Sequence, residues 1–460
     1  MKLIKAFLLV CCLAVVCAFA ATEETTYTKT SGGIQFSITY PSKITCGEPV
    51  EFKFSATGGS GSYKYRIYSL SEADNTTVYD TSMRNNGAYS DAASWSFTFY
   101  ASGKYYIRFS IMDTQTYAYF STGIYDMPIV IDDTDYPSVD SIVSDIASQC
   151  IAKGFATQYE QALWLHDKLL DTCVYDNSLS YCSAEGALAR GTGTCESYHR
   201  ALVKLYNAVG IETGRMTCSD HVWTAAKLDG EWTQIDATWD DPGYVSTIPN
   251  IDAQHLYFGL PDSIMTTVHS YTPQTAYAST GFENCYYAKS GLADSLAQKY
   301  KESANEYLKS GETEFSVEFT DLYSNVLGPI TAYALSNSVF AGYAVGCEYA
   351  DGLLNFTAVR RIPTKSDFTF VLPEEIKIVE DEAFKNASDI TLLWIQDGCQ
   401  SIGKGAFAAI SGLIARVPSS VSYIGDGAFD VDALILCDED SFAYSWAVQN
   451  GLDTIIEAKP

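Results

Sequence analysis

Three short stretches decide the fold of the middle of this 460-residue chain: Gly191-Thr-Gly-Thr-Cys195-Glu-Ser-Tyr198, His221-Val-Trp223 and Trp232-Thr-Gln-Ile-Asp236-Ala-Thr-Trp-Asp-Asp-Pro242. They supply a thiol, an imidazole and a carboxylate in that order. Those are the groups of a nucleophile, of the base that activates it and of the acid that orients the base. We therefore predict that Cys195 is a catalytic nucleophile, that His221 is its general base and acid, and that Asp236 orients His221.

The residues around Cys195 predict the start of a helix. Two glycines precede it, and the apolar side chains that follow have helical spacing, at Ala201, Leu202, Leu205 and Tyr206. A cysteine at a helix N-terminus lies at the positive end of the helix dipole and next to free backbone N–H groups, which favours the thiolate and offers donors to an oxyanion. An isolated cysteine is more often a small buried core residue, so the prediction rests on the position and the neighbours of Cys195.

The segment that contains His221 and Asp236 predicts a β-hairpin. A strand-like run follows His221 and ends at Asp229-Gly230, a typical hairpin turn, and a second run leads from Trp232 to Asp236. Counting residue pairs outward from the turn places His221 one short diagonal away from Asp236, within reach of its side chain. Asp220 is a competing partner in sequence, but its side chain is expected on the opposite face of the strand.

With these motifs the chain resembles the transglutaminase-like superfamily, in particular its bacterial secreted branch. The resemblance covers about 159–271 and includes further phrases: His166-Asp-Lys-Leu-Leu170 with Val174-Tyr-Asp176, Gly186-Ala-Leu188, Gly210-Ile211, and Tyr257-Phe-Gly-Leu-Pro-Asp262 with His269. It implies a papain-like α+β core and a cysteine enzyme with Cys195, His221 and Asp236 in the roles given above. His199 stands where family members often have a small residue, so we expect the local packing there to differ.

Other residues of these motifs have structural interpretations. We interpret Trp223 and Trp239 mainly as core residues, and the Asp-Asp-Pro run at 240–242 as a structural turn. His166 and His269 are interpreted as a helix residue and a loop residue rather than as catalytic groups. The sequence identifies no oxyanion donor beyond the backbone N–H of Cys195.

The N-terminus has the pattern of a secretory signal peptide. Lys2 and Lys5 precede an apolar run over 6–16, and Ala18-Phe-Ala20 supplies small residues for cleavage. The run is too short to span a bilayer stably, and no second long apolar stretch follows. We expect residues 1–20 to be removed and the protein to be secreted or held at the cell surface without spanning the membrane.

Composition limits the partners of the protein. A formal net charge of −27 argues against nucleic acid and against an anionic membrane, because both require a basic face. Ten cysteines follow the signal peptide, and the chain is long enough to build cores without a disulfide framework, although Cys173 and Cys182 are near enough in sequence to bridge. No cysteine or histidine spacing suggests zinc, so we predict neither a metal nor a cofactor.

The remaining patterns predict a multidomain α+β protein. Residues 26–132 alternate apolar and polar positions between turn-forming clusters, which predicts an Ig-like β-sandwich that serves as a spacer or a ligand-binding module. Helical stripes that lead into the cysteine motif assign 136–288 to the transglutaminase-like domain. Residues 289–366 predict a small α/β domain. Its helices and strands are expected at 292–308, 314–319, 322–335 and 353–362.

The last part of the chain, 367–460, contains a repeat. Three phrases ending in Ala-Phe recur at spacings of 23 and 22 residues: Ile378-Val-Glu-Asp-Glu-Ala-Phe384, Ile402-Gly-Lys-Gly-Ala-Phe407 and Ile424-Gly-Asp-Gly-Ala-Phe429. Such units cannot bury their apolar side alone, so they must stack. The phrase resembles the bacterial surface type of leucine-rich repeat, and 440–451 resembles the terminal cap of that family. The resemblance implies a solenoid that binds a host or cell-surface protein or glycan, with a small structural cap as the alternative.

Together these features predict a secreted cysteine-dependent acyl transferase or amide hydrolase, which includes proteases and amidases. Its substrate is expected to be an amide of a protein or of a cell-wall peptide, attacked through a thioester acyl-enzyme. The sequence leaves open whether water or an amine accepts the acyl group. The alternative is a surface adhesin or scaffold in which the triad is vestigial and the repeats and the Ig-like module bind ligands.

Overall fold

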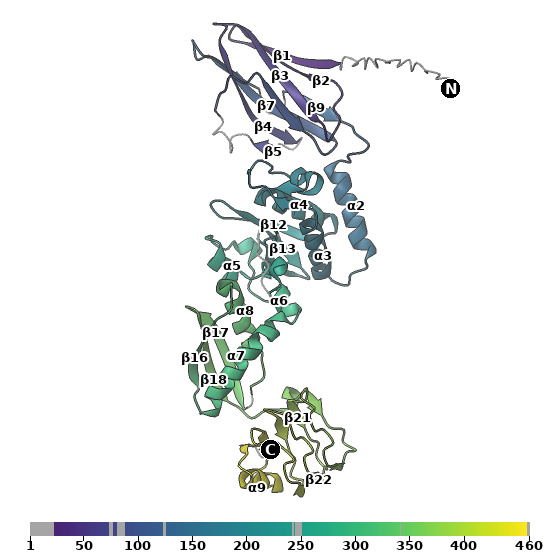
Figure 1. Cartoon of the computed structure of the whole chain (residues 1–460), viewed down its shortest axis with the longest axis vertical. Helices are drawn as coiled ribbons and strands as arrows, with labels where there is room; N and C mark the ends of the chain where they lie inside the picture. The colour runs from purple at the N-terminus through teal and green to yellow at the C-terminus, as the bar shows by residue number, and fades with distance from the viewer. Residues whose placement is uncertain are drawn as a thin grey trace, which may run out of the picture. The chain divides into compact units, whose positions relative to one another are not determined.

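The computed structural model describes residues 23–72, 77–80, 88–122, 126–241, 243, 251–340 and 342–457 (Figure 1). They form two compact units, Met1–Cys285 and Tyr286–Pro460. The predicted signal peptide, 1–20, lies outside the described residues.

The first part of unit 1 consists of two antiparallel β-sheets. One sheet has the order β1-β2-β3-β6, with strands Glu24–Ser31, Ile34–Pro41, Pro49–Gly58 and Ser94–Thr98. The other has the order β5-β4-β7-β8, with β9 paired to β7, and its strands are Thr77–Asp80, Tyr63–Glu72, Gly103–Asp113, Tyr119–Ser121 and Pro128–Ile131. Alternate residues of β3 are buried, as expected for a sheet with one face in a core. Phe36 and Phe109, from the two sheets, stack with ring centroids 4.2 Å apart, so the sheets share one core.

The second part of unit 1 packs helices on a four-stranded antiparallel sheet. The helices are α2 (Val139–Ala152), α3 (Gln158–Leu170) and α4 (Cys195–Ala208). The sheet has the order β12-β13-β14-β15, with strands Glu212–Thr217, Val222–Leu228, Glu231–Ile235 and Phe258–Leu260. The apolar face of α4 lies against β13, and α3 lies against α4 (Figure 1). Side-chain caps start α2 at Ser138 and α3 at Thr157, where Glu160 completes a capping box.

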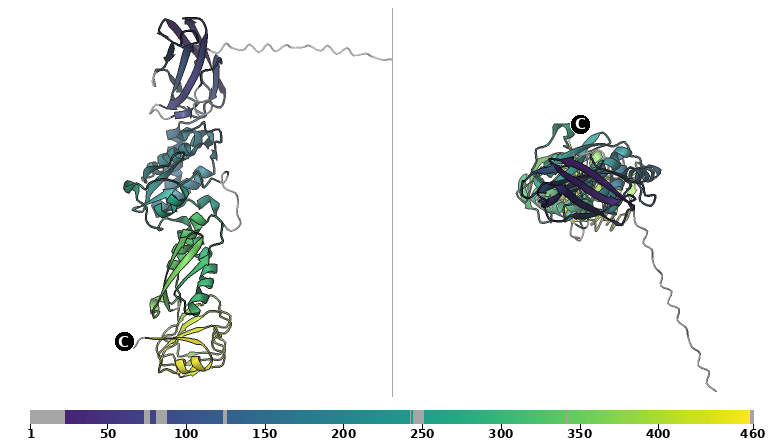
Figure 2. Two further views of the ribbon diagram at one scale, coloured as in Figure 1. Left: turned by 90° about the vertical axis from the view of Figure 1, so that its left-hand side faces the viewer. Right: turned by 90° about the horizontal axis from the view of Figure 1, so that it is seen from above.

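Unit 2 begins with a layer of helices on a three-stranded sheet. Helices α7 (Leu292–Lys309) and α8 (Ser324–Ser336) occupy the two segments in which helices were predicted. They lie on one face of the sheet β16-β18-β17 (Glu314–Glu318, Leu353–Arg360 and Tyr343–Ala350), as Figure 2 shows. The sequence pattern does not predict β17. Its outward positions are alanine, glycine and glutamate, so its hydropathy alternates only weakly along the strand.

The last part of unit 2 has two ladders of short parallel strands. One ladder has the order β19-β21-β23-β25-β26 (Phe370–Val371, Leu392–Trp394, Ile414–Arg416, Leu434–Cys437 and Asp453–Ile456). The other has the order β20-β22-β24 (Ile378–Val379, Ser401–Ile402 and Tyr423–Ile424). Because each repeat adds one strand to each ladder, equivalent side chains stack. Phe384, Phe407 and Phe429 stack with centroids 5.2 and 5.3 Å apart, and the helix α9 (Phe442–Gln449) places Trp446 at the end of this stack.

The glycine of each "I-G" phrase is explained by close packing between successive repeats. A Cβ atom on Gly425 would lie 2.5 Å from the backbone nitrogen of Lys404, in the previous repeat. Gly403 meets the backbone at Asp381 in the same way. Only a residue without a side chain permits this approach, so the repeated glycine is a requirement of the stack.

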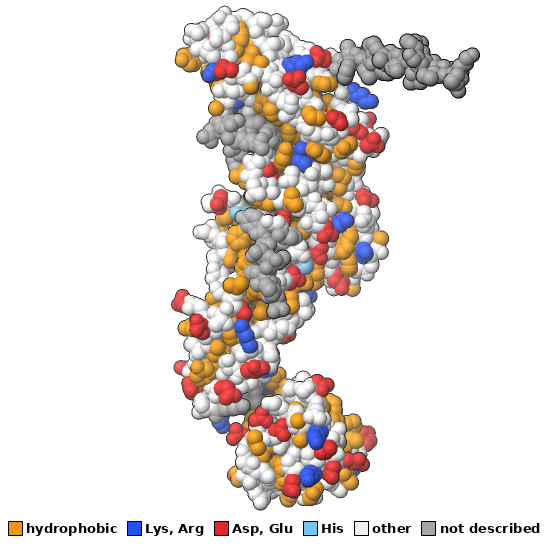
Figure 3. Space-filling model, viewed as in Figure 1, with side chains coloured by type: hydrophobic (Ala, Val, Ile, Leu, Met, Phe, Trp, Pro, Cys, Tyr) orange, Lys and Arg blue, Asp and Glu red, His pale blue; other side chains and the backbone are white. Residues whose placement is uncertain are grey.

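Cysteine state and surface charge complete the description. All ten cysteines among the described residues are free, so the pairing that the spacing of Cys173 and Cys182 allows is not formed. Acidic side chains are spread over both units on the face in Figure 3, in keeping with the net charge of −27. Within the described part of the chain, no helix combines the length and the apolar character needed to cross a membrane.

Candidate active site

Cys195 is the first residue of α4, as the helical spacing predicted. Two glycines shape the entry to this helix. Gly191 has a left-handed backbone (φ 77°) and ends the π-helical turn Gly186–Arg190. A Cβ atom on Gly193 would collide with the side chain of Ser197 in the first turn of α4. The two glycines therefore let the chain enter the helix tightly enough to place Cys195 at its N-terminus.

The predicted hairpin brings His221 and Asp236 together. Strands β13 and β14 pair with Leu228 opposite Glu231, which is the register obtained by counting from the turn. Asp229 and Gly230 both have positive φ angles, 53° and 98°, as a tight two-residue turn requires. His221 precedes β13 and Asp236 follows β14, and His221 Nε2 lies 2.7 Å from Asp236 Oδ2.

The thiol of Cys195 completes a chain of three residues. The Cys195 side chain interacts with His221 and helps to raise the pKa of the imidazole, and because Asp236 holds Nε2, Nδ1 is the ring nitrogen that remains for the thiol. Burial opposes protonation of His221, but the charge and the hydrogen bond of Asp236, assisted by Cys195, raise its pKa to about 10. The imidazole is therefore held in its protonated form beside the thiol at neutral pH.

Asp236 is fully buried and held from several sides. Its Oδ1 accepts hydrogen bonds from the backbone N–H groups of Thr238 (3.1 Å) and Trp239 (3.3 Å). Burial alone would raise the pKa of this carboxyl, but His221 first and then His269 lower it to about 2. The carboxylate is thus fixed in position and in charge before any substrate binds.

His269 is a neighbour of the site that the sequence analysis missed. It was interpreted as a loop residue, and it does lie just beyond helix α5 (Asp262–Val268). Its Nε2 is nevertheless 2.9 Å from Asp236 Oδ2, the same oxygen that binds His221. Only its place in the closing phrase after Tyr257 hinted at this position, because the contact joins residues 33 positions apart.

The two tryptophans of the motif also face the site. The ring of Trp223 stacks on His269 at 4.4 Å and on His221 at 5.9 Å, and that of Trp239 packs edge-on against His269 at 4.3 Å. Trp223 is buried, in line with its interpretation as a core residue, and its Nε1 donates to Gln234 Oε1 at 2.6 Å. Trp223 is a core residue, whereas Trp239 is only partly buried, and the two rings together form a wall around both imidazoles.

His199 and the turn at 240–241 have structural surroundings. His199 is buried with Nδ1 2.9 Å from the hydroxyl of Thr224, and burial, followed by the charge of Arg215, lowers its pKa to about 4. Asp241 accepts hydrogen bonds from the hydroxyl of Tyr198 and from the backbone N–H of Gly243. These contacts connect α4 with the turn that follows Asp236. Pro242 lies outside the described residues.

Comparison with protein families agrees with the two recognised motifs. Residues 146–237 match the model of the transglutaminase-like superfamily, a region that contains Cys195, His221 and Asp236 but not His269. Residues 366–435 match the model of the BspA type leucine-rich repeat region in six copies, where the sequence analysis recognised three Ala-Phe phrases. No curated protein matches the chain. The chain therefore contains a transglutaminase-like core and BspA-type leucine-rich repeats.

Proposed function

We propose that the chain is a cysteine-dependent acyl transferase or amide hydrolase of the transglutaminase-like type. The observation that supports this proposal is the chain of contacts from Cys195 through His221 to the buried carboxylate of Asp236, inside the region that matches the superfamily. A nucleophile, its base and the group that orients the base are the minimum set for acyl transfer on a thiol.

In the proposed reaction the Cys195 thiolate attacks the carbonyl carbon of an amide. The carbonyl π electrons move to the oxygen, and the backbone N–H groups at the start of α4 are the donors that can stabilise this oxyanion. As the tetrahedral intermediate collapses, the C–N bond breaks and His221 gives its proton to the leaving amine. Water or a second amine then attacks the thioester, gives a proton back to His221, and releases the thiolate.

The electrostatics around His221 suit the step in which the tetrahedral intermediate collapses and the amine leaves. A leaving amine needs a proton as the C–N bond breaks, and His221 carries one at neutral pH because Asp236 raises its pKa to about 10. Asp236 also fixes the tautomer and the direction of the ring by binding Nε2. We assign His221 to proton transfer and Asp236 to positioning.

The wider setting is part of the same proposal. We infer a secreted protein with a signal peptide at 1–20, an Ig-like sandwich at 26–132, the transglutaminase-like domain at 136–288, a small α/β domain at 289–366 and the repeat solenoid at 367–460. The substrate class is an amide of a protein or of a cell-wall peptide at or outside the cell surface.

A thiol-specific alkylating probe tests the enzyme proposal. We expect iodoacetamide to label Cys195 faster than Cys182 and Cys218, the other two half-buried thiols among the described residues, with peptide mass spectrometry to distinguish them. Cys195→Ala should abolish turnover in two screens, one that pairs glutamine peptides with an amine and one that offers cell-wall peptides. Labelling of Cys195 at the rate of the unfolded chain, with no turnover in either screen, would contradict the proposal.

A second candidate function is adhesion through the repeats. The observation that favours it is the match of six repeat copies to a leucine-rich repeat family, because stacked repeats present an extended surface to protein ligands. Deleting 367–460 and measuring binding to host or bacterial surfaces tests it. Unchanged binding after the deletion removes the repeats from the binding function.

A further inference from the structure

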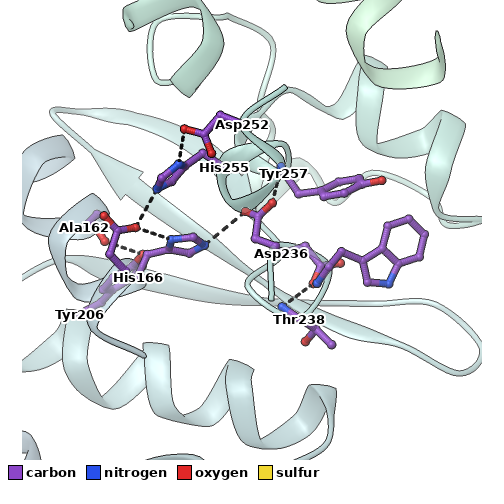
Figure 4. A network of polar contacts seen from close by, with 11 residues as sticks. Ala162, His166, Tyr206, Asp236, Thr238, Asp252, His255 and Tyr257 are labelled. Carbon is purple, nitrogen blue, oxygen red and sulfur yellow. Dashed lines mark hydrogen bonds and ion pairs between the residues drawn. The ribbon is translucent and has the colours of Figure 1, made fainter. Parts of the chain in front are cut away.

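A second group of polar side chains lies outside the Cys195 site. We call it the His166–His255 cluster, and it consists of His166, Asp167, Asp240, Asp252 and His255. It joins helix α3 to the turn after Asp236 and to the short 3-10 helix Ala253–His255 (Figure 4). The proposed reaction uses none of these residues.

Two imidazole nitrogens of the cluster point at one carboxylate oxygen. His166 Nδ1 lies 3.1 Å and His255 Nε2 lies 2.8 Å from Asp167 Oδ1. The three ligand atoms come from a buried helix residue, its chain neighbour and a residue 88 positions further along the chain. In a tetrahedral site with bonds of ~2.0–2.1 Å, neighbouring ligand atoms are about 3.3 Å apart, so a small expansion of these distances admits a metal ion.

The other nitrogen of each imidazole faces a further carboxylate. His166 Nε2 is 3.2 Å from Asp240 Oδ2, and His255 Nδ1 is 2.9 Å from Asp252 Oδ2. Figure 4 shows His255 with Asp252 on one side and His166 on the other. Histidines that bind a metal almost always hold their second nitrogen on such an outer partner, which fixes the ring and raises its basicity. Both histidines of this cluster have that arrangement, and their other nitrogens, His166 Nδ1 and His255 Nε2, both contact Asp167 Oδ1.

Charge and access also fit a divalent cation. His166 and Asp240 are fully buried, whereas the Asp167 side chain is 46% exposed and opens the cluster to solvent. The cluster sets three carboxylates against two imidazoles, so with neutral rings its formal charge is −3, which a divalent cation offsets in large part.

We propose that His166 Nδ1, His255 Nε2 and the Asp167 carboxylate bind one first-row transition-metal dication, with Zn²⁺ as the reference ion, and that Asp240 and Asp252 orient the two imidazoles. The donor set decides the class of ion. Two imidazoles and one carboxylate suit Zn²⁺ and its neighbours, whereas Ca²⁺ and Mg²⁺ need a shell of oxygens. The function of the site is structural, because it fastens α3 to two segments that lie far from it in sequence.

The His221, Asp236 and His269 group provides an internal control. It also places two imidazole nitrogens on one carboxylate oxygen, at 2.7 and 2.9 Å. One of its imidazoles also interacts with the Cys195 side chain, and among the described residues this group lacks the pair of outer carboxylates. A variant in each group therefore tells the two sites apart.

The test is a titration of the chelator-treated mature chain with Co²⁺ followed by visible absorption, and with Zn²⁺ followed by calorimetry. We expect one equivalent to bind, a loss of affinity of at least 100-fold in His255→Gln and Asp167→Asn, and retention in His269→Gln. Asp252→Asn should weaken binding by roughly 10–100-fold, the usual cost of losing an outer partner. Circular dichroism without metal checks that each variant is folded. Asp167 is half-exposed, so Asp167→Asn serves if His255→Gln fails to fold.

Three results would overturn the proposal. The first is no binding of either ion by the wild-type chain, which leaves the cluster as a set of proton-bridged ion pairs. The second is a thiolate-to-cobalt charge-transfer band in the near ultraviolet, which assigns the ion to cysteine. The third is binding that survives both His255→Gln and Asp167→Asn but is lost in His269→Gln, which assigns the ion to the other histidine group.

Discussion

Replacing Asp236 by asparagine tests the electrostatics of the candidate active site directly. The substitution keeps the size of the side chain but removes the negative charge that lies 2.7 Å from His221 Nε2. In the wild-type chain the pKa of His221 is raised from 6.5 to about 10 against the effect of burial. Without the carboxylate, burial remains as the largest influence, so we expect the pKa to fall to 6.5 or below.

The size of this change follows from the two values. A fall from about 10 to 6.5 is roughly 3.5 pH units, which corresponds to on the order of 5 kcal/mol of differential interaction between the two protonation states. This figure is a net one, because burial offsets part of the effect of Asp236 and Cys195 contributes part of the increase. At pH 8 the wild-type ring is protonated and the ring of the variant is neutral, so the variant has no proton for the leaving amine and turnover should be lost at this pH.

The measurement is a nuclear magnetic resonance titration of the histidine ring protons. The chain has five histidines, and His221→Gln assigns the relevant signal. Asp220→Asn is a matched control. It removes the same charge at the residue next to His221. Asp220 is exposed, however, and its Oδ1 accepts hydrogen bonds from Cys218 and Ser219 rather than from His221. A His221 pKa that stays within about one unit of the wild type in Asp236→Asn, or that moves equally in Asp220→Asn, would refute the assignment of Asp236.

Three further expectations concern His269, the ion pair and the repeats. His269→Gln removes a hydrogen bond to the buried carboxylate, worth ~1.5–3 kcal/mol, so kcat/KM should fall by about 10–100-fold with KM little changed; an unchanged kcat would limit His269 to packing. The raised pKa of His221 gives stability that is complete below pH 6.5 and lost as pH rises through about 10, whereas the lowered pKa of Asp236 gives stability that is complete above pH 3.8 and lost as pH falls towards about 2. Chemical unfolding from about pH 2 to about pH 11 should show both losses in the wild type, and neither of these two contributions in Asp236→Asn. Gly425→Ala should destabilise the repeats by ~1–3 kcal/mol through overpacking against Lys404, seen as a lower Tm, and an unchanged Tm would contradict the close approach.

Local sequence patterns were sufficient to predict where the three residues of the candidate active site lie in the secondary structure. The turn Asp229-Gly230 fixes the hairpin register, and strand periodicity then fixes which side chains become neighbours, so His221 and Asp236 could be paired by counting. The start of α4 could be predicted from the glycines and the apolar spacing around Cys195. The repeats could be recognised because the Ala-Phe pair recurs in all three phrases, where its phenylalanines stack, and because two of the phrases also share the glycine that packs against the previous repeat.

Contacts that depend on tertiary packing could not be predicted in this way. His269 and Asp236 are 33 positions apart, and His255 and Asp167 are 88 positions apart, with no shared strand pairing or helix face between them. Their approach is set by where α5 and the short 3-10 helix pack in the tertiary structure, and no periodicity in the sequence records that. The sequence prediction of no metal was based on cysteine and histidine spacing along the chain, which says nothing about side chains assembled from distant segments.

The turn that begins at Asp236 connects the candidate active site with the His166–His255 cluster. The carbonyl oxygen of Asp236 accepts a hydrogen bond from the backbone N–H of Asp240 at 3.1 Å, so two buried carboxylates lie within one turn of chain. Two imidazoles hold the pKa of Asp236 at about 2, whereas burial, only partly offset by His166, raises that of Asp240 to about 6. The Asp236 carboxylate is therefore ionised over the whole physiological range. The charge of the Asp240 carboxylate depends instead on how far His166 offsets the effect of burial. Because the backbone between them is fixed by hydrogen bonds, an ion that fixes His166 also fixes the turn, and with it the position of the carboxylate that orients His221.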